Sequence, residues 1–228
     1  MIELAGKIIV VTGSSIGIGA AAAKAFAKEK AKLVITYRSD KEEAEKTAQE
    51  CRVLGAIDVA LLRLDIADNS SITEAVKQII EKFDHIDLLV NNAGVLVWQK
   101  KVREQSFRDV ELQVRTNLEG TIKMTIASLP YIKDCVINVA SQGGIMVFPG
   151  FIPYCATKFG IRGFTQGLAA EEKGLRVYSV NPGSTATKMT NYQGVPPEKV
   201  ADLIVETAKG TNNIPSGGDV NVWEILGQ

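Results

Sequence analysis

The sequence predicts an α/β protein built on a doubly wound parallel sheet of about seven strands, with helices on both faces. Short β-branched runs alternate along the chain with longer amphipathic runs, which is the pattern of repeated βαβ units. The short runs are apolar throughout, as expected for strands that are buried on both sides. A glycine-rich stretch directly follows the first of them, and nucleotides bind beyond the carboxyl ends of strands in such sheets.

The expected strands are the short apolar runs that turn residues or helical patterns bound on either side. They fall at 7–11, 32–36, 58–62, 88–90, 136–139, 176–180 and 220–222. The expected helices are the longer runs with apolar residues at a spacing of three and four. They fall at about 17–29, 40–54, 70–83, 103–130, 153–172 and 197–209.

The longest helical pattern, 103–130, has an irregularity at Asn117. Asparagine is a poor residue inside a helix because its side chain competes for backbone hydrogen bonds. We therefore expect Asn117 to mark a kink whose freed carbonyl holds a water.

One domain, residues 1–228, accounts for the chain, because no Pro/Ser-rich stretch, charge run or repeat divides it. Hydrophobic residues make up 46% and charged residues 23%, which is typical of a globular domain. The 26 basic and 26 acidic side chains cancel, so no basic excess points to a nucleic-acid partner.

The chain also lacks the sequence marks of membrane insertion, secretion and metal binding. No apolar run is as long as a membrane span, and an apolar strand follows the N-terminus at once. Three scattered cysteines, Cys51, Cys135 and Cys155, are too few for a disulfide framework or a zinc site. A single histidine, His85, argues against a histidine-based triad or metal site. We expect a cytoplasmic protein without a metal or a membrane partner.

The segment TGSSIGIG, after the first strand, is the candidate nucleotide cradle. Its glycines permit a tight turn that brings the backbone close to a pyrophosphate, and the following helix presents free N–H groups. The alternative is a plain strand–turn–helix connection, because a glycine-rich loop alone is a weak signal. The candidate cofactor residues here are Gly13, Ser14, Ser15, Ile16, Gly17, Ile18 and Gly19.

The end of the second strand bears on the choice between NADP and NAD. An NAD-selective site has an acid there for the ribose 2′-hydroxyl, but this chain has Tyr37 followed by Arg38. A guanidinium suits a 2′-phosphate in charge and geometry, so we expect NADP(H), with NAD as the weaker ligand. The alternative is a solvated surface arginine. Asp65, followed by Ile66, is free to touch the adenine, because Asp68 or its neighbours are better placed to cap the next helix.

The segment NNAG follows the fourth strand, and its small and amide residues suit a backbone that passes close to a cofactor. A turn is the alternative, because Asn and Gly are common turn residues. The candidate cofactor contacts are Asn91, Ala93 and Gly94.

Ser141 ends the fifth strand, and Tyr154 and Lys158 lie four residues apart, on one face of the next helix. A phenol has a pKa near 10, and a nearby ammonium favours its ionised form. The serine hydroxyl can hold a substrate oxygen beside the phenol, which makes an acid/base site for a carbonyl or an alcohol. As the alternative, Tyr154 and Lys158 form one face of an amphipathic helix.

In this order and spacing, the motifs resemble those of the short-chain dehydrogenase/reductase family, and the match covers nearly the whole chain. The resemblance implies a seven-stranded Rossmann-like sheet, with Tyr154 as acid/base, Lys158 on the nicotinamide ribose, Ser141 on the substrate oxygen and Asn117 on a proton-relay water. It also implies contacts to the nicotinamide from the segment NPGSTAT, and a homodimer or homotetramer built through the 103–130 and 153–172 helices. The residues of that segment are Pro182, Gly183, Thr185 and Thr187.

Two stretches depart from the family pattern. A short link at 133–135 should trim a surface loop, and the segment after Pro182 is too short for the usual substrate lid, which suggests an open pocket. Four residues follow strand ends on the ligand side and either line the substrate pocket or pack elsewhere. They are Trp98, Phe148, Met189 and Tyr192. Cys155, beside Tyr154, is interpreted as a small buried thiol without a redox role.

The leading hypothesis is an NADP(H)-dependent carbonyl reductase or alcohol dehydrogenase. Its substrate could be a 3-oxoacyl thioester, a simple ketone, a polyol or a sugar, because fold does not choose among them. The alternative is an NADP-sensing regulator that binds the cofactor without chemistry, although a sensor has no need of Ser141, Tyr154 and Lys158. An epimerase or dehydratase on nucleotide sugars would need a longer chain.

Overall fold

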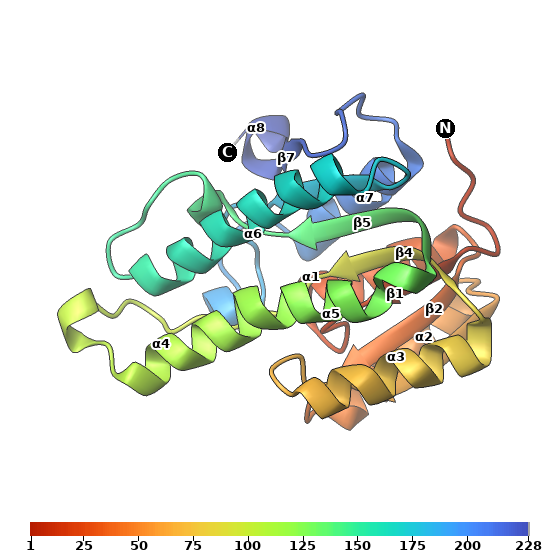
Figure 1. Ribbon diagram of the computed structural model, residues 1–228, viewed down its shortest axis with the longest axis horizontal. Helices are drawn as coiled ribbons and strands as arrows, with labels where there is room; N and C mark the ends of the chain where they lie inside the picture. Colours follow the sequence, from red (N-terminus) through yellow and green to blue (C-terminus); the bar gives the residue numbers. More distant parts are fainter. Residues whose placement is uncertain (228) are drawn as a thin grey trace.

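A single seven-stranded parallel sheet forms the centre of the molecule in the computed structural model, which describes residues 1–227 (Figure 1). The strand order is β3-β2-β1-β4-β5-β6-β7, so the order reverses between β1 and β4. This confirms the predicted fold class. The strands are β1 (Ile8–Val11), β2 (Lys32–Tyr37), β3 (Asp58–Arg63), β4 (Ile86–Asn91), β5 (Ile132–Val139), β6 (Arg176–Asn181) and β7 (Asp219–Asn221).

Helices cover both faces of the sheet (Figure 1). One face carries α1 (Gly17–Lys28), α2 (Lys41–Val53) and α7 (Pro197–Lys209), and the other carries α3 (Asn69–Phe83), α5 (Thr121–Ser128) and α6 (Ile152–Glu171). A short helix, α8 (Val222–Leu226), follows β7.

Two hydrophobic cores fill the spaces between the sheet and its helices. Along β1, Ile9 and Val11 belong to the core under α1, α2 and α7, whereas Val10 belongs to the opposite core. Both sides of the strand are therefore buried, which explains why its sequence is a continuous apolar run. Buried alanines on α1 let that helix pack closely against the strands.

The predicted 103–130 helix is wrong as a single element. The chain forms a 3₁₀ turn (η1, Val102–Glu104), a new helix α4 (Phe107–Gln113), a π-helical segment (η2, Val114–Gly120), then α5 and another 3₁₀ turn (η3, Leu129–Tyr131). Ser106 interrupts the pattern, because its hydroxyl accepts from the Asp109 N–H and the Asp109 carboxylate accepts in return from the Ser106 N–H.

Asn117 lies in the π-helical segment, so the helix is irregular at this residue, and the expected kink stays a prediction. Its carbonyl is not left free, however, because it accepts a hydrogen bond of 2.9 Å from the Thr121 hydroxyl. The wider turn of a π-helix is compatible with such side-chain bonding and often occurs at functional sites.

The short link expected at 133–135 lies elsewhere. β5 already begins at Ile132, so residues 133–135 are part of the sheet, and the shortened connection is η3. The register against β4 shifts between Ile86 and Leu88, which places Asp87 at an irregularity. Strand pairing thus extends through the residues that were expected to form the link.

None of the helices among residues 1–227 is both long enough and apolar enough to cross a membrane. Cys51, Cys135 and Cys155 are free and buried, as expected for Cys155. The cytoplasmic location expected from the sequence stays a prediction.

Candidate active site

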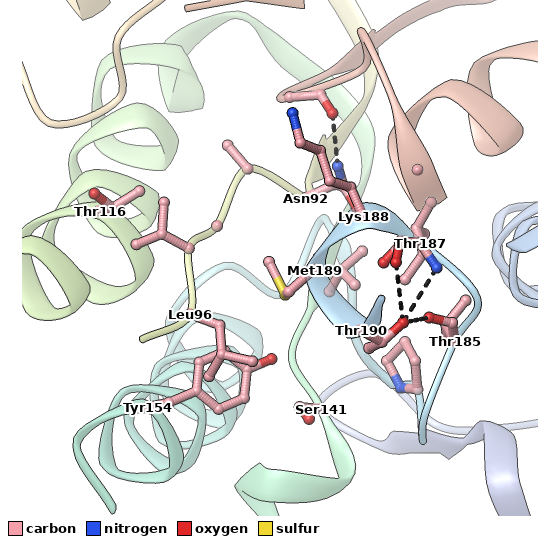
Figure 2. A pocket seen from close by; sticks show the side chains of 18 of the residues that line it. Asn92, Leu96, Thr116, Ser141, Tyr154, Thr185, Thr187, Lys188, Met189 and Thr190 are labelled. Atoms are coloured by element: carbon pink, nitrogen blue, oxygen red, sulfur yellow. Dashed lines mark hydrogen bonds between the residues drawn. The ribbon is translucent and has the colours of Figure 1, made fainter. Parts of the chain in front are cut away.

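A cavity of about 630 Å³ opens at the carboxyl ends of the strands, where the strand order reverses. Its walls come from the turns after β1 to β6 and from the start of α6. Figure 2 shows Ser141 and Tyr154 facing this space from the end of β5 and from α6, with Met189 of the loop after β6 above them in this view.

The glycine turn after β1 is packed too closely to accept side chains. A Cβ atom on Gly13 would lie 2.9 Å from the Cα atom of Ala93, and one on Gly19 would lie 2.5 Å from Asn92 Nδ2. Gly13 and Gly17 also have positive φ angles of 62°. Because no side chain fills the turn, its backbone borders the cavity directly, which is the geometry that a pyrophosphate needs.

The N-terminus of α1 has no side-chain cap. Ile16 occupies the N-cap position, and no acidic residue lies in the first turn. By contrast, Asp40 caps α2 and Asp68 caps α3, as the sequence suggested for Asp68. The free N–H groups of α1 therefore remain available to an anion in the cavity.

Sequence reasoning missed the latch that joins the glycine turn to the segment after β4. The Thr12 hydroxyl accepts from the backbone N–H groups of Asn92 and Ala93, at 2.9 and 3.0 Å. Asn92 Nδ2 donates to the carbonyls of Thr12 and Gly13, both at 3.0 Å. The signal was present, because a threonine and an amide follow neighbouring strands in TG and NNAG.

Arg38 is exposed and borders the cavity after β2, with Ser39 and Asp40 beside it. Asp65 and Ile66 border the same end after β3, and Asp65 Oδ1 accepts a local bond of 3.0 Å from the Ala67 N–H. The Arg38 guanidinium has no ion-pair partner among the described residues, whereas the Asp40 carboxylate is already engaged as the cap of α2.

Ser141, Tyr154 and Lys158 meet at the other end of the cavity. Lys158 is buried, and its Nζ donates a bond of 2.8 Å to the Val139 carbonyl and lies 5.6 Å from the centre of the Tyr154 ring. Gly94 lies opposite, and a Cβ atom there would lie 3.8 Å from Lys158 Nζ and 3.3 Å from Asn117 Oδ1. Of the four side chains predicted to be catalytic, Ser141, Tyr154 and Lys158 are thus brought together around one open space.

Burial changes the proton affinities of the phenol and the ammonium in opposite directions. It raises the pKa of Tyr154, although the hydrogen bond with Ser141 opposes that rise. It lowers the pKa of Lys158 to about 8, because the ammonium has lost its hydration. The phenol therefore stays protonated at neutral pH, which is the form that donates a proton.

Asn117 acts on the backbone of a neighbouring segment. Its Oδ1 accepts from the Val95 N–H and its Nδ2 donates to the Val95 carbonyl, both at 2.8 Å. Nδ2 also donates to the Thr157 hydroxyl at 3.3 Å. The side chain thereby fixes the segment after β4 against α6, and the expected water relay stays a prediction.

Two predicted cofactor contacts need correction. The Ser14 side chain is fully buried, where its hydroxyl donates to the Val11 carbonyl and accepts from the Thr36 N–H. The Asn91 amide points into the sheet and donates to the Thr125 hydroxyl and to Asn138 Oδ1. Neither side chain borders the cavity, because both complete hydrogen bonds between neighbouring elements. Gly19 and Asn117 do not border the cavity either.

The remaining predicted residues border the cavity. From the cradle and the segment after β4 these are Gly13, Ser15, Ile16, Gly17, Ile18, Ala93 and Gly94, and from the loop after β6 they are Pro182, Gly183, Thr185 and Thr187. Trp98, Phe148 and Met189 line it as well, whereas Tyr192 does not and is 73% exposed. Sequence reasoning missed Phe151, whose ring meets that of Trp98 edge to face with the centroids 5.3 Å apart.

The fold, the glycine cradle and the acid/base trio together define a nucleotide-binding oxidoreductase. Residues 7–196 match the sequence pattern described as short chain dehydrogenase. The chain belongs to the short-chain dehydrogenase/reductase family, as its motifs indicated.

Relatives with assigned activities include an NADP-dependent 3-hydroxy acid dehydrogenase of Schizosaccharomyces pombe. It is 30% identical over an alignment of 237 positions, which covers 94% of this chain and 91% of the relative. A 3-oxoacyl-[acyl-carrier-protein] reductase of Thermotoga maritima is 34% identical over 222 residues, covering 94% and 85%. A solved structure, a short chain dehydrogenase from Burkholderia cenocepacia in complex with NADP, has a TM-score of 0.89 at 28% identity and covers 96% and 97%.

Proposed function

We propose that this protein is an NADP(H)-dependent oxidoreductase that interconverts a carbonyl group and a secondary alcohol. The observation that carries the proposal is the position of Tyr154, whose phenol faces the cavity beside Ser141 and over Lys158. The same cavity continues to the glycine cradle and the free N-terminus of α1, so one continuous space joins Tyr154 to the proposed dinucleotide site.

When bound, NADPH would supply the hydride, held by the glycine cradle and α1 at its pyrophosphate. The Ser141 hydroxyl holds the substrate oxygen next to the Tyr154 phenol. Tyr154 donates its proton to that oxygen as negative charge develops on it. The buried Lys158 then stabilises the phenolate through its charge.

Arg38 supports the choice of NADPH over NADH. Its guanidinium borders the adenosine end of the cavity, where an acid would select NAD, and one charge-assisted contact is worth about 1.5–3 kcal/mol. The NADP-dependent relative and the NADP-bound structural neighbour support the same choice. Arg38→Ala should raise the Kd for NADPH about ten- to a hundredfold and leave the Kd for NADH nearly unchanged. Equal losses, or a wild-type preference for NADH, would contradict the assignment.

The substrate is proposed to be a small carbonyl compound that enters past an apolar rim. Trp98, Phe148 and Met189 line the entrance beside Tyr154, so a substrate with an apolar chain or ring next to the carbonyl is favoured. The test is NADPH oxidation over a panel containing acetoacetyl-CoA, butanone, cyclohexanone and fructose. The wild-type protein should turn over at least one of them. If the protein binds NADPH but oxidises it with none of these compounds, the sensor hypothesis replaces the enzyme hypothesis.

We also propose that α4, α5 and α6 form the contact surface of a homodimer or homotetramer. The three helices neighbour one another in the fold (Figure 1). Apolar side chains are exposed along them, with Phe107 at 90% exposure, Ile126 at 62% and Phe159 at 40%. Light scattering at micromolar concentration should give at least twice the mass of one chain. Ile126→Glu should reduce that mass, and a monomeric wild-type protein would contradict the proposal.

A further inference from the structure

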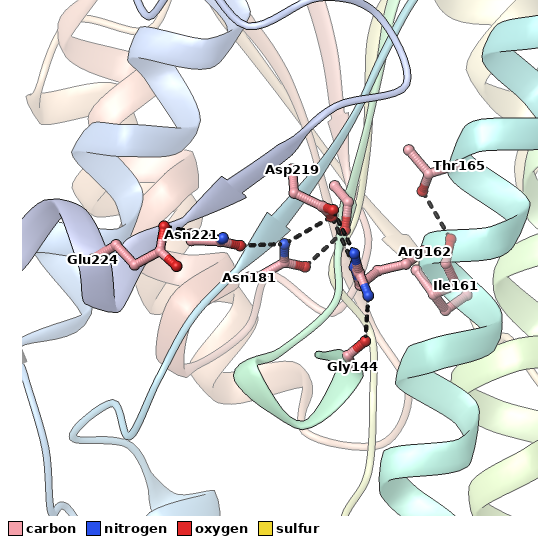
Figure 3. Close-up of polar contacts among 9 residues, drawn as sticks. Gly144, Ile161, Arg162, Thr165, Asn181, Asp219, Asn221 and Glu224 are labelled. Carbon is pink, nitrogen blue, oxygen red and sulfur yellow. Dashed lines mark hydrogen bonds and ion pairs between the residues drawn. The ribbon is translucent and has the colours of Figure 1, made fainter. Parts of the chain in front are cut away.

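Arg162 joins three segments, which are α6, β7 and the turn that contains Gly144 (Figure 3). From α6 its Nε and Nη2 donate to the two carboxylate oxygens of Asp219, on β7, at 2.9 and 2.6 Å. Its Nη1 donates to the Gly144 carbonyl at 2.7 Å. Gly144 belongs to the 3₁₀ turn that directly follows Ser141. One guanidinium therefore holds both the last strand and the turn that carries the serine.

The turn lies directly on the backbone of α6. A Cβ atom on Gly144 would lie 2.8 Å from the Lys158 carbonyl and 3.2 Å from the Arg162 side chain. Lys158 precedes Arg162 by one helical turn and Tyr154 precedes it by two, so all three share one side of the helix. A movement of the turn relative to α6 would therefore change the distance between Ser141 and Tyr154.

The turn has few ties of its own to the rest of the molecule. Its internal bonds run from the Gly143 N–H to the Ser141 hydroxyl at 3.0 Å and from the Gly144 N–H to the Ser141 carbonyl at 2.8 Å. The Gln142 N–H donates to the Pro182 carbonyl, also at 2.8 Å. Pro182 and Arg162 thus hold the turn from two sides.

Asp219 connects these two sides to each other. Besides Arg162, its Oδ1 accepts a bond of 2.9 Å from Asn181 Nδ2, and Asn181 ends β6 immediately before Pro182. Burial raises the pKa of Asp219, but the bonds from Arg162 and Asn181 outweigh that effect and keep the carboxylate ionised. Arg162 and Asp219 therefore form a pair of opposite charges. Through Asn181, this pair connects Arg162 to the segment of Pro182, and both of these residues hold the turn.

We propose that Arg162, held by Asp219, is a positioning residue that sets the Ser141 hydroxyl at the correct place beside Tyr154. The inference rests on the proposed function for its catalytic consequence, because it assigns Arg162 to the same site. Arg162 does not line the cavity, and it acts through the Gly144 carbonyl.

The chain supplies a matched control at the opposite end of the sheet. Arg176, on β6, donates through Nε and Nη2 to the two oxygens of Asp134, on β5, at 2.9 and 2.7 Å. The two arginines are similarly exposed, with 21% and 23% of their side chains accessible. Arg176 lies at the amino ends of the strands, far along the sheet from the cavity. Loss of either pair should cost similar stability, but only one should change catalysis.

The kinetic test compares Arg162→Ala and Arg162→Lys with Arg176→Ala, using NADPH and the panel carbonyl with the highest wild-type turnover. A small misplacement of a catalytic group costs up to about a hundredfold in rate, so Arg162→Ala should lose about 10- to 100-fold in kcat. Its Kd for NADPH should stay within about twofold, and Arg162→Lys should recover part of the rate. Arg176→Ala should keep wild-type kcat.

A second measurement needs no substrate. Backbone hydrogen exchange at residues 142–146 should become faster in both Arg162 variants and stay unchanged in Arg176→Ala. Wild-type kcat in a folded Arg162→Ala protein, or an equal loss in Arg176→Ala, would overturn the inference. So would unchanged exchange in the turn. If the wild-type protein reduces no carbonyl while exchange responds as expected, the proposed function fails and the mechanical role of Arg162 stands.

Discussion

Each end of the sheet holds a buried charged side chain, but only one of these two charges has a counter-ion. At the amino ends, the Asp87 carboxylate accepts from the Ile8 N–H at 2.8 Å and from Lys7 Nζ at 2.9 Å, and His85 Nε2 lies 3.3 Å away. At the carboxyl ends, the Lys158 ammonium is buried with a single neutral acceptor, the Val139 carbonyl, among the described residues. One end pairs its buried charge and the other leaves it without a counter-ion.

The pKa values follow the same division. Burial raises the pKa of Asp87, but the bonds from Ile8 and Lys7 outweigh that effect and hold it below its ordinary value. At Lys158 nothing outweighs burial, which lowers the pKa to about 8. The amino end is therefore arranged for stability, whereas the carboxyl end keeps a destabilising charge that a ligand can use. Substitutions at the two ends should separate stability from turnover.

The largest effect is expected from Tyr154→Phe, which removes the proton donor and keeps the ring. The kcat with NADPH and a panel carbonyl should fall by about 10²–10⁴-fold, because general acid catalysis is lost. The Kd for NADPH and the melting temperature should change little. A Phe variant with wild-type kcat would refute the assignment of Tyr154 as the acid. The carboxyl end of the sheet would then have no demonstrated role in turnover.

Asp87→Ala should give the reverse result at the other end of the sheet. The loss leaves a buried N–H and Lys7 without their partner, which costs about 2–3 kcal/mol of unfolding free energy, while kcat per folded molecule stays unchanged. Because the folded pKa lies below the unfolded value, the contribution of Asp87 is present above about pH 4 and disappears as pH falls further. Urea unfolding of both proteins from pH 7 to pH 3 measures this. A difference in unfolding free energy that stays the same from pH 7 to pH 3 would contradict it.

Lys158→Met should stabilise the protein while it impairs catalysis. The drop in pKa from 10.5 to about 8 corresponds to a cost of about 3 kcal/mol for the protonated form, and loss of the bond to Val139 offsets about 1 kcal/mol. We expect a gain of about 2 kcal/mol in unfolding free energy at pH 7. The cost applies in full below pH 8, so the wild-type protein should recover relative to the variant between pH 8 and 10.5. A variant that is less stable than the wild-type protein at pH 7 would show that other interactions already offset the cost of burying the Lys158 ammonium.

The smallest effect is expected from Asp58→Asn, also at the amino end. Its partner Lys82 lies 3.0 Å away, but both side chains are about 40% exposed, at 41% and 43%. Exposed pairs contribute at most about 1 kcal/mol and are screened by salt. Thermal unfolding at 20 mM and 500 mM salt should show a small difference that shrinks with salt. A loss as large as that of Asp87→Ala would show that burial does not decide the strength of the amino-end pairs.

Elements whose information is local were predictable from the sequence. All seven strands and the family were found from apolar runs, glycines and short motifs. The interruption at Ser106 was also readable, because SFRD has the spacing of a capping box, but the helical periodicity on either side concealed it. The π-helical turn was not readable, since seven residues are too few to distinguish its period from that of an α-helix.

The errors at the site arose where neighbouring residues of one kind point in opposite directions. Asn91 and Asn92 are adjacent, and β4 is buried on both faces, so no polar alternation tells which amide faces the cavity. Ser14 and Ser15 pose the same problem after a glycine with positive φ. Arg162 and Asp219 are 57 residues apart, and only the order of β6 and β7 in the sheet brings them together.

The π-helical segment has a consequence for how the gene can vary. A π-turn holds about one residue more than an α-turn, so deletion of a single codon within 114–120 would restore a regular helix. The flanking helical segments would keep nearly their present orientation, because the wide turn already accommodates the extra residue. Met124 would stay in the core, but the wide turn that presents Asn117 to Val95 would be lost. A one-codon deletion here should therefore spare the fold and disturb the contacts of Asn117.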